Sequence, residues 1–147
     1  MSRKIDNIWD LLNFHEGRVK HAYQDSRGFW TIGVGHLIDK RPGGGISDEM
    51  IDKLLDDDIK VHTAKLEKAL PWTAALDPVR KAVLQDMTFN MGLRGVLEFK
   101  NTLAAVKAGD MAGAAQGMLK SKWAQQVGPR AQRLAGMMQS GEWPEIQ

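Results

Sequence analysis

The chain has 147 residues and no cysteine, which excludes a disulfide framework and a thiolate metal site. Its 20 basic and 18 acidic residues leave a formal net charge of +2, too small an excess for a nucleic-acid-binding protein. No segment approaches the ~20 apolar residues of a membrane-spanning helix, and the polar N-terminus lacks the apolar stretch of a secretory signal. We therefore expect one compact protein without an export route of its own.

The first third of the chain predicts a helix followed by a small sheet. Apolar residues recur at helical spacing from Ile5 to Leu12, and Gly17 is suited to end that helix. Between residues 19 and 38, β-forming residues flank the turn sequence Asp-Ser-Arg-Gly at 25–28, which indicates a small antiparallel sheet. A glycine-rich loop follows at 39–46.

The remainder of the chain predicts helices. Ser47 is a favourable N-cap for a long helix that Pro71 must stop. Asp77 and Pro78 form the start signal of a second helix, which Gly92 closes. Three further helices are predicted at 101–108, 111–119 and 129–139.

The predicted fold class is α+β and mainly helical. A sheet lobe is expected at about 17–46, and the helix at 47–70 connects it to a helical lobe. That helical lobe is expected to contain 71–147 together with 1–16, so that the whole chain forms a single domain of two lobes.

Two carboxylates near the start of the chain suggest glycoside hydrolysis. That reaction needs one protonated carboxyl group to donate to the leaving oxygen and one carboxylate to activate water or to attack the sugar. Glu16 precedes the helix-ending Gly17, and Asp25 begins the predicted turn, so the chain can fold back and bring the two together. At the C-terminal end of a helix, Glu16 meets the negative end of the helix dipole, which suits the proton-carrying role. Considered alone, Glu16 can be interpreted as an ordinary helix-end residue and Asp25 as an ordinary turn residue.

The sequence around these carboxylates resembles the active-site segment of tailed-phage lysozymes. The resemblance rests on His15-Glu16-Gly17, Tyr23-Gln24-Asp25 and the segment Gly-Phe-Trp-Thr-Ile-Gly-Val-Gly-His-Leu at 28–37. It continues in the same order through Phe89-Asn90-Met91-Gly92, Lys100-Asn101-Thr102-Leu103, Ser121-Lys122-Trp123 and Arg130-Ala131-Gln132-Arg133. The resemblance implies a lysozyme-like fold with an active cleft between its lobes, and no metal or organic cofactor.

The resemblance also implies the roles of the catalytic residues. Glu16 matches the family's general acid, Asp25 its second carboxylate, and Thr31 the hydroxyl that helps to hold the attacking water. A threonine near the turn can present a hydroxyl group to water without any appeal to the family. The alternative for Thr31 is an ordinary β-branched strand residue.

Three further residues are expected to support the site. By resemblance, His36 pairs with Asp58 on the connecting helix, and Arg130 approaches the catalytic glutamate. The four histidines are scattered and suggest no metal-ligand set. Arg130 can also be read as a solvated basic residue on a helix.

The resemblance implies a substrate cleft with residues from both lobes. The expected contacts are Gly35, Leu37, Phe89, Asn90 and Thr102. Phe89 can equally be read as a core residue. Gly117 stands where the family has a side-chain contact, and the 39–46 loop is shorter than in the T-even phage members. We therefore expect the outer subsites of the sheet lobe to differ.

The resulting expectation is a monomeric endolysin that hydrolyses the β-1,4 bond between N-acetylmuramic acid and N-acetylglucosamine in bacterial peptidoglycan, with inversion. It would be made in the host cytoplasm and reach the cell wall at lysis through a holin-type pore.

Two alternatives remain open. A lytic transglycosylase cuts the same bond without water but needs only one acid/base, so Asp25 and Thr31 argue against it. A non-enzymatic protein that disrupts the wall or membrane would act through basic helices. The C-terminal Lys120, Lys122, Arg130 and Arg133 exceed Glu142 and Glu145 by only two charges.

Overall fold

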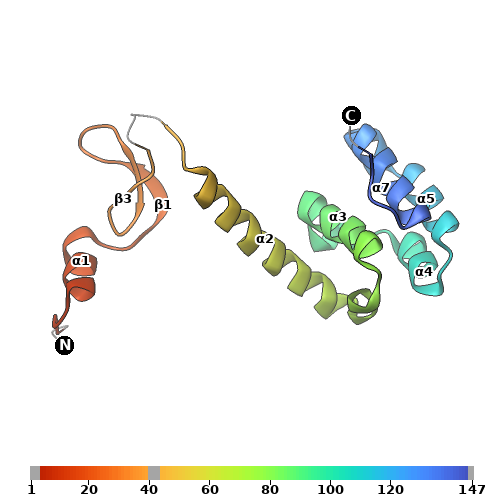
Figure 1. Ribbon diagram of the computed structural model, residues 1–147, viewed down its shortest axis with the longest axis horizontal. Coiled ribbons are helices and arrows are strands. Elements are labelled where there is room, and N and C mark those ends of the chain that lie inside the picture. The colour runs from red at the N-terminus through yellow and green to blue at the C-terminus, as the bar shows by residue number, and fades with distance from the viewer. Residues whose placement is uncertain (1–3, 40–43, 146–147) are drawn as a thin grey trace. The chain divides into compact units, whose positions relative to one another are not determined.

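The computed structural model describes residues 4–39 and 44–145 and has two compact units, Met1–Leu54 and Leu55–Gln147 (Figure 1). The first contains a helix and a three-stranded sheet, and the second is helical. The predicted α+β, mainly helical fold class is therefore confirmed. The association of residues 1–16 with the helical lobe stays a prediction.

The first unit begins with helix α1 (Ile8–Glu16). The Asn7 side chain caps this helix by accepting a hydrogen bond of 2.8 Å from the Asp10 backbone N–H. The helix therefore begins three residues after Ile5, the first residue of the apolar pattern. It ends at Gly17, as predicted, where φ is +74°.

The sheet of the first unit follows directly. Strands β1 (Val19–Gln24), β2 (Trp30–Gly33) and β3 (His36–Leu37) are antiparallel and lie in chain order. The central strand β2 therefore pairs on both sides: Thr31 lies opposite Tyr23 of β1 and Leu37 of β3. Both neighbouring strands thus fix the position of residue 31.

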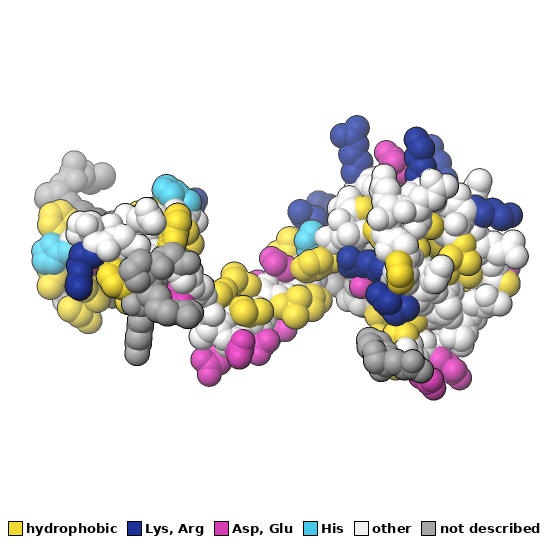
Figure 2. All heavy atoms as spheres, turned by 90° about the horizontal axis from the view of Figure 1, so that it is seen from above, with side chains coloured by type: hydrophobic (Ala, Val, Ile, Leu, Met, Phe, Trp, Pro, Cys, Tyr) yellow, Lys and Arg dark blue, Asp and Glu magenta, His cyan; other side chains and the backbone are white. Residues whose placement is uncertain are grey.

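Helix α2 (Asp48–Ala69) is the long helix predicted at 47–70. The Ser47 hydroxyl caps it by accepting a hydrogen bond from the Met50 N–H at 3.3 Å. Figure 2 shows acidic side chains gathered along one side of this helix and apolar side chains along another, as an amphipathic helix requires. Of the 39–46 loop that precedes it, residues 40–43 lie outside the described residues.

Several helices pack around one apolar core in the second unit. These are the 3₁₀ helix η1 (Pro71–Ala75) and helices α3 (Pro78–Leu97), α4 (Lys100–Ala108), α5 (Met111–Leu119), α6 (Lys122–Val127) and α7 (Pro129–Ser140). Leu66, Leu84, Met87, Met118 and Met138 are among the core side chains with almost no exposed surface. Within the described residues, no helix is both long and apolar enough to cross a membrane.

Helix α3 continues beyond its predicted end. Its helical geometry breaks at Gly92, where φ is +77° and ψ is 163°, as the sequence predicted. The chain then makes another helical stretch as far as Leu97. This stretch, η1 and α6 were not predicted, because segments so short carry little hydrophobic periodicity.

The N-cap of α3 leads to a first prediction. Asp77 accepts a hydrogen bond from the Arg80 N–H at 3.0 Å and pairs with the Arg80 guanidinium at 3.4 Å. Burial raises the pKa of Asp77, but the hydrogen bonds and charge of Arg80 outweigh it, so that the pKa lies below its ordinary value. We expect Asp77→Ala to lower the free energy of unfolding by about 1 kcal/mol at pH 7.

The effect of Asp77→Ala should depend on pH with a definite sign. A carboxylate with a lowered pKa stabilises the fold above its ordinary pKa of about 4 and loses this contribution as the pH falls through the lowered value. Urea unfolding of both proteins at pH 7 and near pH 2.5 measures the difference, which should shrink at the lower pH. An equal or larger difference at low pH would contradict this origin of the effect.

Candidate active site

Glu16 is the last residue of α1, and its carboxyl group lies against Gly35 in the turn between β2 and β3. A Cβ atom at residue 35 would lie 2.8 Å from Glu16 Oε2 and 2.9 Å from the Glu16 carboxyl carbon. Gly35 has a φ of +66°, in the left-handed region that glycine adopts without steric cost. Residue 35 therefore leaves room for the Glu16 carboxyl group because it has no side chain.

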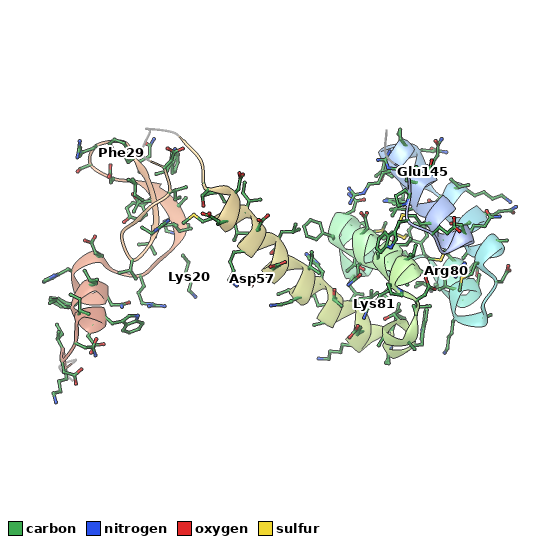
Figure 3. All side chains as sticks on the ribbon, viewed as in Figure 1. Lys20, Phe29, Asp57, Arg80, Lys81 and Glu145 are labelled. Carbon is green, nitrogen blue, oxygen red and sulfur yellow. The ribbon has the colours of Figure 1, made fainter. Side chains whose placement is uncertain are left out.

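Asp25 is fixed by the turn between β1 and β2. Its Oδ1 accepts hydrogen bonds from the backbone N–H groups of Arg27 at 2.8 Å and Phe29 at 2.9 Å. The Asp25 N–H in turn donates to the Phe29 carbonyl at 2.8 Å. Phe29 lies on the connection between the two strands (Figure 3). The predicted turn at 25–28 is thus present, and it orients the carboxylate that it contains.

Thr31 is nearly buried in the central strand β2, with 5% of its surface exposed. Its hydroxyl donates a hydrogen bond to the Phe29 carbonyl at 3.2 Å. Because a hydroxyl has one donor and two lone pairs, the Thr31 oxygen can still accept a hydrogen bond. Asp25 and Thr31 are therefore both hydrogen-bonded to the backbone of one residue, Phe29.

The remaining predicted residues of the sheet unit lie on β3 or beside it. Leu37 is 42% exposed and lies opposite Thr31. His36 is also exposed and lies opposite Ile32. Asp58, its predicted partner, is exposed on α2 and belongs to the second unit. The His36–Asp58 ion pair stays a prediction.

A double-mutant cycle tests that ion pair. His36→Asn and Asp58→Asn should each lower the thermal stability, and the double variant should lose little more than the worse single variant. The expected coupling is about 0.5–1 kcal/mol, because both groups are solvent-accessible in their own units. Losses that simply add would count against a direct pair.

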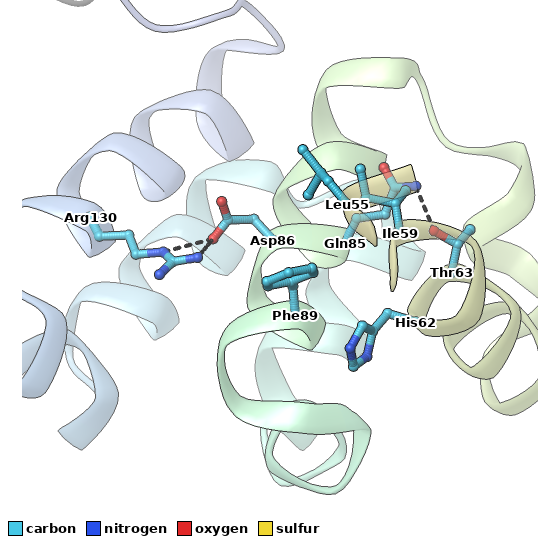
Figure 4. A pocket seen from close by; sticks show the side chains of 8 residues that line it. All are labelled: Leu55, Ile59, His62, Thr63, Gln85, Asp86, Phe89 and Arg130. Carbon is cyan, nitrogen blue, oxygen red and sulfur yellow. Dashed lines mark hydrogen bonds and ion pairs between the residues drawn. The ribbon is translucent and has the colours of Figure 1, made fainter. Parts of the chain in front are cut away.

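Phe89 and Arg130 line a cavity of about 360 Å³ in the second unit (Figure 4). Phe89 is 43% exposed, so it is not a core residue. Its ring centroid lies 5.3 Å from that of His62. The Arg130 guanidinium binds Asp86 Oδ1 through Nε at 2.9 Å and Nη2 at 2.8 Å. The approach of Arg130 to Glu16, which belongs to the first unit, stays a prediction.

Asp86 is a candidate site residue that the sequence analysis missed. It lies three positions before Phe89 on α3, so the two share one helix face. That three-residue spacing is the one feature of the sequence that could have indicated Asp86. Its pairing with Arg130, however, spans 44 positions of sequence. An acidic residue in a helix gives no indication of a partner so far away.

Asn90 and Thr102, the other predicted cleft residues, are held in different ways. Asn90 is exposed, and its Oδ1 accepts a hydrogen bond of 2.9 Å from the indole Nε1 of Trp123. Thr102 is 6% exposed and lies so close to Gly117 that a methyl group at residue 117 would overlap its hydroxyl. Substrate contacts of these residues stay predictions.

Comparisons with known proteins identify the family. Residues 13–140 match the phage lysozyme family. The chain is 28% identical to "Probable T4-type lysozyme 1" of Dictyostelium discoideum, over 93% of this chain and 96% of that protein. It is 30% identical to "Pre-baseplate central spike protein Gp5" of Enterobacteria phage T4, over 90% of this chain and 27% of that protein. It is 28% identical to "Endolysin" of Acyrthosiphon pisum secondary endosymbiont phage 1, over 82% of this chain and 80% of that protein.

The family match covers the C-terminal part of the helix that carries Glu16, the sheet that carries Asp25 and Thr31, and nearly all of the helical unit. The chain therefore belongs to the phage lysozyme family and is a glycoside hydrolase of the lysozyme type, a peptidoglycan hydrolase.

Proposed function

We propose that this lysozyme is an endolysin that hydrolyses the β-1,4 bond between N-acetylmuramic acid and N-acetylglucosamine with inversion. The observation that carries the proposal is the hydrogen bonding around Phe29, whose N–H binds the Asp25 carboxylate and whose carbonyl binds the Thr31 hydroxyl. Glu16, the third member, lies in the same compact unit. The two carboxyl groups match the acid and base that an inverting hydrolase requires, and by resemblance the Thr31 hydroxyl would help to hold the water.

The proposed reaction assigns one proton transfer to each carboxyl group. The Glu16 carboxyl O–H donates its proton to the glycosidic oxygen as the bond from that oxygen to the anomeric carbon breaks. A water molecule, whose O–H donates to the Thr31 oxygen, forms the new bond to the anomeric carbon from the opposite face. The Asp25 carboxylate accepts a proton from this water. The anomeric carbon of the product has inverted configuration. The reaction leaves Glu16 deprotonated and Asp25 protonated, and proton exchange with solvent restores the starting states.

A lytic transglycosylase is the alternative enzyme. In that reaction an internal hydroxyl group of the sugar attacks the anomeric carbon, so the anhydro product contains one water fewer than the hydrolysis product. The Asp25 carboxylate, which accepts two backbone hydrogen bonds, has no necessary task in that reaction, which favours hydrolysis. Mass spectrometry of fragments from purified peptidoglycan tests the proposal: hydrolysis adds one water for each bond cut, whereas anhydro-terminated fragments would contradict it.

A non-enzymatic disrupting protein is less well supported. Figure 2 shows Lys and Arg side chains projecting from the second unit at several separate places, rather than along one apolar helix face. Some basic groups are also neutralised, because Arg130 pairs with Asp86 and Lys81 with Glu67. Binding to an anionic surface would therefore accompany hydrolysis rather than replace it.

The biological part of the proposal concerns access to the wall. An endolysin made in the host cytoplasm needs a holin-type pore to reach its substrate, and we propose that this chain acts as a monomer at the end of infection. Cells that produce it without a pore should stay intact and should lyse when the inner membrane is permeabilised. Lysis of the producing cells without permeabilisation would contradict the dependence on a pore. Analytical ultracentrifugation tests the monomeric state.

A further inference from the structure

Helix α4 begins without a side-chain cap. Its N-cap residue, Phe99, provides no side-chain acceptor. Among the residues that the structure describes, none accepts a hydrogen bond from the backbone N–H groups of Lys100, Asn101 and Thr102. The first bonded N–H group is that of Leu103, which donates to the Phe99 carbonyl at 2.9 Å. Three backbone donors therefore point out of the start of the helix, where the helix dipole has its positive end.

A cavity of about 410 Å³ opens at this end of the helix. Its walls are the three residues of the first turn together with Glu98, Phe99 and Gly117, the last from α5, which packs against α4. Lys100 is exposed and contributes a positive charge, whereas Glu98 contributes one carboxylate. Because water can satisfy the donors of a helix start, these features alone do not make a binding site.

The hydroxyl group of Thr102 is a buried polar group that faces the same space. Thr102 is 6% exposed, yet its Oγ1 atom makes no hydrogen bond with any residue that the structure describes. In that part of the chain no fully enclosed side-chain oxygen lacks a partner, so Oγ1 keeps a small accessible surface. Gly117 leaves that opening, because it lines the cavity with Thr102 and a Cβ atom at residue 117 would overlap Oγ1. The cavity therefore receives an unpaired hydroxyl as well as the three backbone donors.

We propose that the start of α4 is a binding site for an oxyanion, a phosphate or carboxylate group, which accepts hydrogen bonds from the backbone N–H groups and from the Thr102 hydroxyl. A negatively charged oxygen also interacts favourably with the helix dipole and with Lys100. A cation would be repelled by the same groups, and a neutral hydroxyl would gain nothing from the charge of Lys100. Glu98 weakens the binding. The site would bind its anion whether or not Glu16 acts as proposed.

Titration with inorganic phosphate, followed through the amide NMR signals, measures this binding directly. Sodium chloride at equal ionic strength is the blank. The amide signals of residues 100–102 should shift and reach saturation. Thr102→Val removes the hydroxyl and keeps the shape of the side chain, so Kd for phosphate should rise roughly two- to tenfold. Thr102→Ser keeps the hydroxyl and should bind phosphate as the unmodified protein does.

Two charge variants should change the affinity in opposite directions. Lys100→Gln removes the attractive charge and should raise Kd about two- to threefold. Glu98→Gln removes the repulsive charge and should lower Kd by a similar factor. Lys107→Gln, which removes an exposed charge from the last turn of the same helix, is the matched control and should leave Kd unchanged.

A glycine pair tests whether the anion enters the cavity. Gly117→Ala fills the space over the Thr102 hydroxyl and should abolish the saturable shifts. Gly136→Ala makes the same change in α7, where a Cβ atom would meet no other atom within 4 Å, and should preserve them. Signals at 100–102 that fail to shift, or binding that survives both Gly117→Ala and Thr102→Val, would overturn the inference. If Gly117→Ala does not fold, an unchanged Kd in both Thr102→Val and Lys100→Gln overturns it.

Activity measurements distinguish the source of the oxyanion. If the site takes a carboxylate of the peptidoglycan, phosphate should compete with soluble fragments and raise their KM in the unmodified protein but not in Gly117→Ala. If the site takes a free oxyanion such as inorganic phosphate, phosphate should raise the thermal stability and leave KM unchanged. Both results support the site. Failure of the proposed function would appear instead as anhydro products or as activity without Glu16, and it would not alter the phosphate titration.

Discussion

Replacing Glu16 by glutamine is expected to reduce turnover on purified peptidoglycan by a factor on the order of 10² or more. The glutamine side chain has nearly the same size and can occupy the space beside Gly35, but it cannot donate a proton to the leaving oxygen. A water molecule cannot replace the carboxyl group at comparable effective concentration. The fold should therefore persist while the chemical step slows, so that kcat falls and KM changes little.

The control for this variant is Glu142→Gln, which makes the same chemical change at an exposed residue after α7. It should keep its full activity. Circular dichroism and thermal unfolding check that both variants are folded. A folded Glu16→Gln protein that still clears cell walls at nearly the normal rate would refute the assignment of the general acid.

Replacing Gly35 by alanine is expected to reduce activity by a similar factor while leaving the protein folded. The new methyl group would lie 2.8 Å from Glu16 Oε2, which is closer than non-bonded atoms approach. Since Oε2 is at the far end of a flexible side chain, the carboxyl group can move away at little cost in stability. A displacement of about 1 Å at a catalytic group can reduce the rate on the order of 10²-fold.

Gly33→Ala is a closely matched control two residues earlier, at the end of β2. Gly33 also has a positive φ, of +72°, but a Cβ atom there would meet no other atom within 4 Å. Both variants therefore carry the same kind of backbone strain, and only Gly35→Ala meets Glu16. Rate measurements on both should show a much larger loss for Gly35→Ala. Equal losses would mean that strain in the turn, not displacement of Glu16, reduces the activity.

The sequence predicted those helices whose ends are marked by a capping side chain or by a glycine. Ser47 and Asp77 cap the helices that they were expected to cap, and Gly17 and Gly92 interrupt the chain where expected. The short elements escaped prediction because tertiary packing, and not their own periodicity, stabilises them. Helix α6 is one example: it consists of six residues held partly by the burial of Trp123.

The sequence suggested which residues form the candidate site, and their catalytic roles stay predictions, but it could not predict their contacts. The turn at 25–28 already contains the hydrogen bonds that orient Asp25, since they connect neighbouring residues. The contact between Glu16 and Gly35, and the pairing of Arg130 with Asp86, require the folded chain. A pattern of residue types suggests candidate reactive groups, and only the three-dimensional structure identifies the residues that contact them.

The anomeric configuration of the first product is the most direct test of the central claim, that Asp25 acts through a water held with Thr31. Proton NMR spectra recorded within the first minutes of digestion of soluble peptidoglycan fragments can distinguish the two anomers before mutarotation mixes them. An inverting reaction on the β-linked substrate predicts that the α-anomer appears first. A β-anomer in the earliest spectra would mean that Asp25 attacks the sugar itself, or that another group activates the water, and would contradict the proposed mechanism.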